Sequence, residues 1–148
     1  MKKLLLALAI TMTSFTAQAS DLVTKISPHS VNDTMDRLVA AVEKAGATVF
    51  ARVDHAKGAM SIDAELAPNQ MLVFGNPKLG TPIMQQNPAA GLDLPIRVVV
   101  FQDTDGKTNV AYHNPSRIAD DHGLPADFKA LQMMGGAVDK LTGAATAE

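Results

Sequence analysis

Two extended segments joined by an Asp-Gly turn constrain the fold of this chain most strongly. Residues 95–101 (Pro-Ile-Arg-Val-Val-Val-Phe) are rich in β-branched side chains, and residues 107–113 resume the extended pattern after Asp105-Gly106. An Asp-Gly pair between two strand patterns is typical of a hairpin, because glycine supplies the positive φ that such turns need. The sequence therefore predicts an antiparallel hairpin, and with it a largely antiparallel sheet.

Two longer segments carry the spacing of amphipathic helices. After Ser30, which suits an N-cap, apolar side chains recur every three or four positions as far as Val42, and Gly46 follows them. A second helical pattern is expected to begin near Pro125 and to continue through residues 128–141. Placing both helices on one face of the sheet gives the predicted fold class, α+β: a single domain with a mostly antiparallel sheet packed against two main helices.

Other segments complete this expected organisation. Segment 77–88 is expected to contain one short helix at most, and residues 120–122 (Asp-Asp-His) are expected to form a solvated loop. The remaining strands are expected at residues 22–26, 47–53 and 71–74.

The first 19 residues have the three parts of a secretory signal peptide. Two lysines follow the initial methionine, residues 4–10 form a short apolar core, and an Ala-Gln-Ala cleavage site ends the segment. The apolar core is shorter than the roughly 20 residues that cross a bilayer. We therefore expect cleavage after Ala19, export to a bacterial periplasm, and a mature single domain at residues 20–148.

Composition narrows the functions that this domain can have. The formal net charge of the whole chain is −2, and removal of the two signal-peptide lysines makes it more negative by two units. The chain has no cysteine. A mildly acidic domain is a poor electrostatic partner for nucleic acid or an anionic membrane. Disulfides, zinc–thiolate sites and thiol nucleophiles all require cysteine. We expect no metal, no cofactor, no nucleic-acid partner and no membrane contact after signal cleavage.

Polar residues at the ends of predicted strands are candidates for a site. Asp54 and His55 follow one strand and His113 ends another, so they would form an acid–base pair or a metal site if they met. Successive strand residues point to opposite faces, so a direct Asp54–His55 pair requires the strand to end at Asp54. Residues 75–81 (Gly-Asn-Pro-Lys-Leu-Gly-Thr) have the glycine spacing of a phosphate-binding loop but lack its lysine. Nucleotide hydrolysis is therefore disfavoured, while a structural turn and a ligand-contacting loop both remain open.

Three ordered motifs resemble those of the bacterial and archaeal domain-of-unknown-function family 302. They occupy residues 50–59, residues 72–84, and the segments 92–98, 101–106 and 111–115 taken together. The chain is therefore identified as a periplasmic member of this family. The resemblance implies a compact domain of helices and strands that forms homodimers, and it implies no established biochemical activity.

The polar motif residues are the expected site, because the motif glycines and prolines have ready structural roles. We expect a domain without catalytic activity that acts as a dimer and binds a small ligand or a protein partner. The alternative is an enzyme with a general acid–base site near Asp54 and His55. A third reading is an interaction module that exposes an apolar patch away from the motifs. The expected ligand-binding residues are Asp54, His55, Asn76, Thr81, Met84 and Tyr112.

Overall fold

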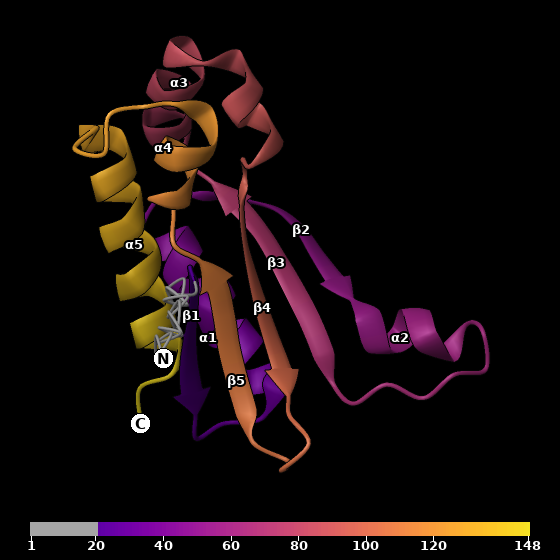
Figure 1. Cartoon of the computed structure of the whole chain (residues 1–148). Coiled ribbons are helices and arrows are strands. Elements are labelled where there is room, and N and C mark those ends of the chain that lie inside the picture. The colour runs from indigo at the N-terminus through magenta and orange to yellow at the C-terminus, as the bar shows by residue number, and fades with distance from the viewer. Residues whose placement is uncertain (1–20) are drawn as a thin grey trace, which may run out of the picture.

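One antiparallel sheet organises the computed structural model, which describes residues 21–148 (Figure 1). The expected signal peptide and Ser20 lie outside the described residues. The strand order is β1-β5-β4-β3-β2, and every neighbouring pair is antiparallel. The strands are β1 (Leu22–Ser27), β2 (Thr48–Asp54), β3 (Asn69–Gly75), β4 (Ile96–Gln102) and β5 (Thr108–His113). This arrangement confirms the predicted α+β fold.

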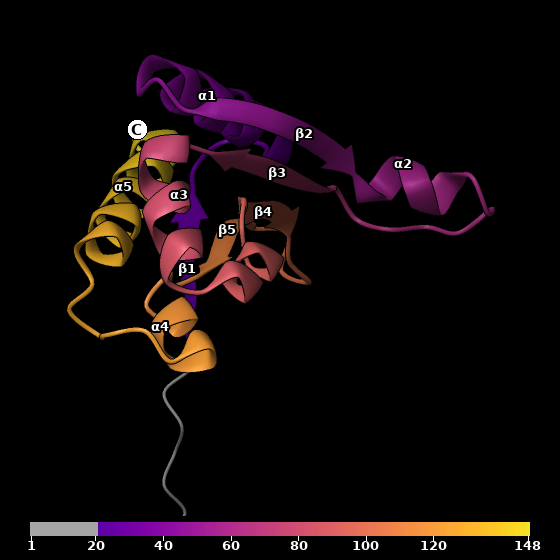
Figure 2. The same ribbon diagram turned by 90° about the horizontal axis from the view of Figure 1, so that it is seen from above.

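Two long helices, α1 and α5, cover one face of this sheet, which we call the helix face. Figure 1 views the sheet from the opposite side, the open face, with α1 behind the strands. Figure 2 shows β2, β3 and α2 extending away from the rest of the molecule as an arm. The helical segments are α1 (Val31–Lys44), α2 (His55–Met60), α3 (Pro77–Gln86), the 3₁₀ turn η1 (Pro88–Leu92), α4 (Arg117–His122) and α5 (Lys129–Ala145).

The hydrophobic core lies between the helix face and the two long helices. Leu72 pairs with Val98 across β3 and β4, and both side chains are fully buried. Leu38 of α1 and Val138 of α5 reach the same core, with at most 1% of their surface exposed. Burying large aliphatic side chains stabilises the fold by roughly 1.5–3 kcal/mol each. This core therefore fixes which side of each strand faces the helices.

The predicted start and end of the first long helix are confirmed. The Ser30 hydroxyl accepts a hydrogen bond from the backbone N–H of Asp33 at 3.1 Å, as an N-cap does. At the other end Gly46 has a φ of +71°, a conformation that glycine adopts without a steric penalty. The chain can therefore turn directly from α1 into β2.

The predicted hairpin is also confirmed, and Asp103 holds its turn. The Asp103 carboxylate accepts hydrogen bonds from the backbone N–H of Asp105 at 3.0 Å and of Lys107 at 2.9 Å. The bond from the Lys107 backbone, together with one from the Asn109 side chain, holds the pKa of Asp103 below its ordinary value. Gly106 supplies the positive φ, +78°, that the turn requires.

The third helix is longer than expected, because it begins directly after β3. The Asn76 side chain caps it by accepting the backbone N–H of Lys78 at 3.0 Å. Pro77 suits the first helical position, where no N–H is needed. The interior residues Gly80 and Pro82 lower helix propensity, and for this reason the sequence pattern predicts only a short helix here.

Two expectations near the C-terminus are wrong. Residues 120–122 lie in α4 rather than in a solvated loop, because Arg117 pairs with Asp121 one turn later at 2.9 Å. The last helix begins at Lys129 rather than near Pro125. Pro125 instead opens a single turn, in which its carbonyl accepts the backbone N–H of Phe128 at 3.0 Å.

Candidate ligand-binding site

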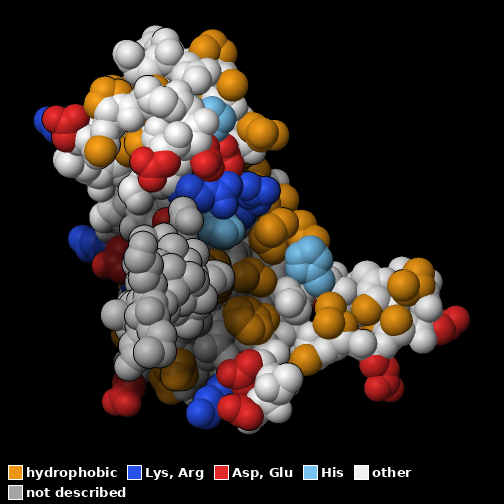
Figure 3. Space-filling model, in the orientation of Figure 1, with side chains coloured by type: hydrophobic (Ala, Val, Ile, Leu, Met, Phe, Trp, Pro, Cys, Tyr) orange, Lys and Arg blue, Asp and Glu red, His pale blue; other side chains and the backbone are white. Residues whose placement is uncertain are grey.

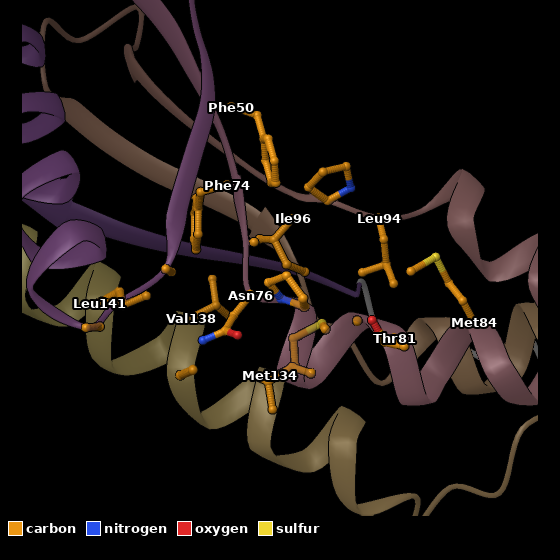
Figure 4. Close-up of a pocket in the computed structure, with 18 residues that line it drawn as sticks. Phe50, Phe74, Asn76, Thr81, Met84, Leu94, Ile96, Met134, Val138 and Leu141 are labelled. Atoms are coloured by element: carbon orange, nitrogen blue, oxygen red, sulfur yellow. The ribbon is translucent and has the colours of Figure 1, made fainter.

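A cavity of about 480 Å³ lies at the end of the sheet where β3 finishes and β4 begins (Figure 4). The C-terminal end of β3 and the first residue of β4 form one wall, and helices α3 and α5 form the others. This volume falls within the range of about 300–1,000 Å³ that small-molecule sites occupy.

The walls of this cavity are almost entirely apolar. Phe74 and Ile96 contribute from the sheet, and both are more than nine-tenths buried. Met134 and Val138 contribute from α5 on the facing side. Figure 4 shows these side chains surrounding a common space, with Phe50 above it. Such a lining favours an apolar occupant.

Gly75 allows two parts of this wall to come together. A Cβ atom at this position would lie 3.4 Å from the Phe50 ring and 3.4 Å from the Cβ of Pro95. A larger side chain would therefore push the Phe50 ring or Pro95 outwards. Glycine at this motif position has a packing role beside the cavity.

Asn76 is placed in the cavity wall by its capping role. Its side-chain oxygen accepts the backbone N–H of Lys78, and its main-chain carbonyl accepts those of Leu79 and Gly80 at 2.9 and 3.0 Å. Since the oxygen of the amide faces the helix, the amide nitrogen is the end left for other contacts. Figure 4 shows the amide beside Val138 and Met134.

Three of the six predicted site residues line this cavity together: Asn76, Thr81 and Met84. Thr81 and Met84 stand one turn apart on α3. Met84 is 37% exposed, which places it at the edge of the cavity rather than in its interior. The segment that follows β3 is therefore the part of the expected site that the fold gathers at one place.

Asp54 and His55 lie elsewhere. Asp54 pairs with Gln70 near the start of β3, whereas Asn76 follows the other end of that strand. The Asp54 carboxylate caps α2 by accepting the backbone N–H of Lys57 at 3.0 Å, and His55 is exposed on the first turn. Neither residue lines the cavity.

His113 does not approach Asp54 or His55. It ends β5, and β5 runs in the same direction as β3, so His113 lies at the opposite end of the sheet from Asp54. Among residues 21–148 no three His, Asp or Glu side chains are grouped closely enough to hold a metal ion.

Tyr112 lies on the helix face, in a polar contact with α5. Its hydroxyl donates to the Asp139 carboxylate at 3.3 Å, and Lys25 lies 2.8 Å from the same oxygen. Burial raises the pKa of Tyr112 above its ordinary value. The hydrogen bond from Lys25, together with its charge, lowers the pKa of Asp139. Tyr112 does not line the cavity, so its contact here joins β1, β5 and α5.

A cluster around His122 was missed by the sequence reading. His122 is only 10% exposed, and its Nε2 lies 2.6 Å from the Asp93 carboxylate, which Arg117 also approaches at 3.4 Å. Leu94, the residue after Asp93, lines the cavity. These contacts therefore hold α4 against the segment before β4, which forms part of the cavity wall. The spacing of Arg117, Asp121 and Gly123 is the sequence signal that would have revealed this helix.

Comparison with known proteins shows that the sequence matches one protein family. A family model described as "Domain of unknown function DUF302" matches residues 23–141. A solved structure, the uncharacterized conserved protein DUF302 from Bacillus stearothermophilus, superposes with a TM-score of 0.78 at 19% identity. The match covers 86% of this chain and 99% of that one. It confirms the fold.

Two Brucella proteins are similar in sequence. The chain is 40% identical over 119 residues to fluoride-specific ion channel FluC 1 of Brucella suis biovar 1 (strain 1330), covering 79% of this chain and 47% of that protein. It is equally similar to FluC 2 of Brucella melitensis biotype 1, of which it covers 44%. The chain thus spans about half the length of these relatives. No helix within residues 21–148 is both long and apolar enough to cross a membrane.

The Lys25–Asp139 pair gives a testable pH dependence. Because the pKa of Asp139 is lowered in the folded state, its contribution to stability is present above the ordinary aspartate value of 3.8 and is lost as the pH falls through the folded pKa. We expect Asp139→Asn to lower the midpoint of thermal unfolding at neutral pH, and the gap from the unsubstituted protein to close below pH 3.8.

Calorimetry across this pH range checks the expectation. Asp21→Asn is the matched control, since Asp21 is exposed at the residue before β1 and should leave the midpoint nearly unchanged at every pH. A gap for Asp139→Asn that stays constant from neutral to acid pH would contradict the assignment.

Proposed function

This chain belongs to the DUF302 family, and we propose that it binds a small, mostly apolar molecule in the cavity between α3 and α5 without transforming it. The observation that carries the proposal is the cavity itself, with its volume of about 480 Å³ and its apolar walls. It also gathers Asn76, Thr81 and Met84 from one motif segment.

The composition of the walls supports an apolar occupant of adaptable shape. Phe50 and Phe74 offer flat aromatic surfaces, while Met84 and Met134 offer flexible thioether chains that adjust to irregular ligands. Each Å² of apolar ligand surface removed from water contributes about 25 cal/mol to binding. A cavity of this kind holds its ligand mainly by desolvation.

The alternative, an enzyme with an acid–base pair at Asp54 and His55, has less support. The Asp54 carboxylate is engaged in capping α2, and His55 is exposed at the start of that helix. A molecule in the cavity lies at the other end of β3 from both residues. The Brucella proteins whose names state a fluoride-specific ion channel are longer than this chain, which covers 47% of the first of them.

A second part of the proposal is that the protein acts as a homodimer through the open face. Strand pairing places Ile26, Phe101 and Met71 on this face, and Ile26 is 65% exposed. Figure 3 shows apolar side chains gathered over this face and along the arm that carries α2. A face built from five adjacent strands can pair with its own copy around a two-fold axis, which would cover both copies equally.

A third part is export. The basic start, short apolar core and Ala-Gln-Ala site support cleavage after Ala19 and a periplasmic location. Expression of the full chain in a bacterium with two membranes should yield a periplasmic protein whose intact mass corresponds to a start at Ser20. A protein that keeps Met1 and stays with the membrane fraction would contradict export.

Filling the cavity tests the binding function. Ala137 lines the cavity from α5, so Ala137→Phe should occupy part of its volume. We expect the uncharged dye N-phenylnaphthylamine to bind the unsubstituted protein with increased fluorescence, and Ala137→Phe to weaken binding about tenfold, or roughly 1.4 kcal/mol. Gly80→Leu, which fills the cavity from α3, should act in the same direction.

The matched control for this titration is Gln132→Phe, which adds the same ring at an exposed position of the same helix. It should bind the dye like the unsubstituted protein, and circular dichroism should show that all variants are folded. Absence of dye binding by the unsubstituted protein, or equal weakening by Gln132→Phe, would refute the proposed function.

Disrupting the open face tests the dimer. Ile26→Lys places a charge in the proposed interface, where it would be buried without a partner. We expect light scattering after size exclusion to give a dimer for the mature protein and a monomer for Ile26→Lys. Leu92→Lys is the control, since Leu92 is 83% exposed and lies on η1 outside the sheet. A monomeric unsubstituted protein would overturn this part of the proposal.

A further inference from the structure

The amide nitrogen of Asn76 is a hydrogen-bond donor held ready at the cavity. The oxygen of the same amide, Oδ1, accepts a hydrogen bond from the backbone N–H of Lys78 at 3.0 Å. This bond turns the amide nitrogen away from the helix. Within residues 21–148 no hydrogen bond involves Asn76 Nδ2. Two N–H groups are therefore available to a molecule in the cavity.

The surroundings of this donor make it selective. The other lining residues are apolar except for Thr81, which is exposed on α3, and none of them is charged. A donor beside apolar walls gains more from an acceptor than it would in water once the bound ligand displaces the competing water. No carboxylate in the first turn of α3 would repel an anionic head group.

We infer that the ligand is an apolar molecule with one hydrogen-bond-accepting head, a carboxylate or carbonyl oxygen, that binds Asn76 Nδ2. This inference rests on the proposed function and adds the chemistry of the head group. The apolar body then lies against the apolar lining of the cavity, which includes Ile96, Met134 and Val138. The head contributes orientation and selectivity, and the body contributes most of the desolvation.

The variant Asn76→Asp separates the head-group contact from the fold. Aspartate caps a helix about as well as asparagine and has nearly the same size, so α3 should keep its start. The substitution replaces the two N–H groups by an anionic oxygen. A carboxylate ligand should therefore be repelled, and an ammonium ligand of the same length should be attracted.

The experiment compares decanoate, methyl decanoate and decylammonium as competitors of N-phenylnaphthylamine. We expect the unsubstituted protein to bind decanoate and methyl decanoate at least about tenfold more tightly than decylammonium. In Asn76→Asp the affinity for decanoate, expressed relative to that for the dye in the same variant, should fall about tenfold or more, and that for decylammonium should rise. Tighter binding of decanoate than of its ester identifies a free carboxylate as the preferred head, and the reverse identifies a carbonyl.

The control is Asn114→Asp, the same charge change at an exposed asparagine that caps a turn outside the cavity. It should leave the affinity order of the unsubstituted protein unchanged. Equal affinities for the three head groups, or equal loss of all ligands in Asn76→Asp, would overturn the inference and leave the proposed function standing. Failure of the dye to bind the unsubstituted protein would overturn both.

Discussion

Burial of the helix face of the sheet against α1 and α5 is the interaction on which the rest of this structure depends. Without cysteine, the fold has no disulfide to support it, and the apolar core supplies most of its stability. Leu72 and Val98 at the centre of the sheet are fully buried, in one core with Leu38 of α1 and Val138 of α5. This packing determines the face on which every strand residue lies, and so which motif residues can reach a cavity.

The cavity forms at the end of the sheet, where the packing between the strands and the two long helices stops. The chain leaves β3 at Gly75 and enters α3 immediately, with Asn76 as the cap and Pro77 as the first helical residue. The helix α3 therefore stands at the end of the sheet, and the space between it and α5 is lined by the last core side chains. One asparagine thus has two roles: its oxygen begins the helix, and its nitrogen faces the cavity wall.

Local sequence patterns predicted much of the fold. They did not predict elements whose formation depends on contacts between distant parts of the chain. Strand alternation, the Ser30 cap and the Asp-Gly hairpin are local signals, and each was confirmed. The helix at residues 117–122 has only six residues, and its contact with Asp93 spans 24 residues of sequence, so periodicity did not reveal it.

The expected site was split for a topological reason. Asp54 and Gly75 end neighbouring antiparallel strands, which places them at opposite ends of the sheet.

Methyl NMR of the methionines tests the cavity most directly. On titration with N-phenylnaphthylamine, the Met84 and Met134 signals should shift, while those of Met60 and Met133, which are exposed outside the cavity, should not. Shifts at Met60 and Met133 with none at Met84 and Met134 would show that apolar molecules bind elsewhere, and would contradict the account.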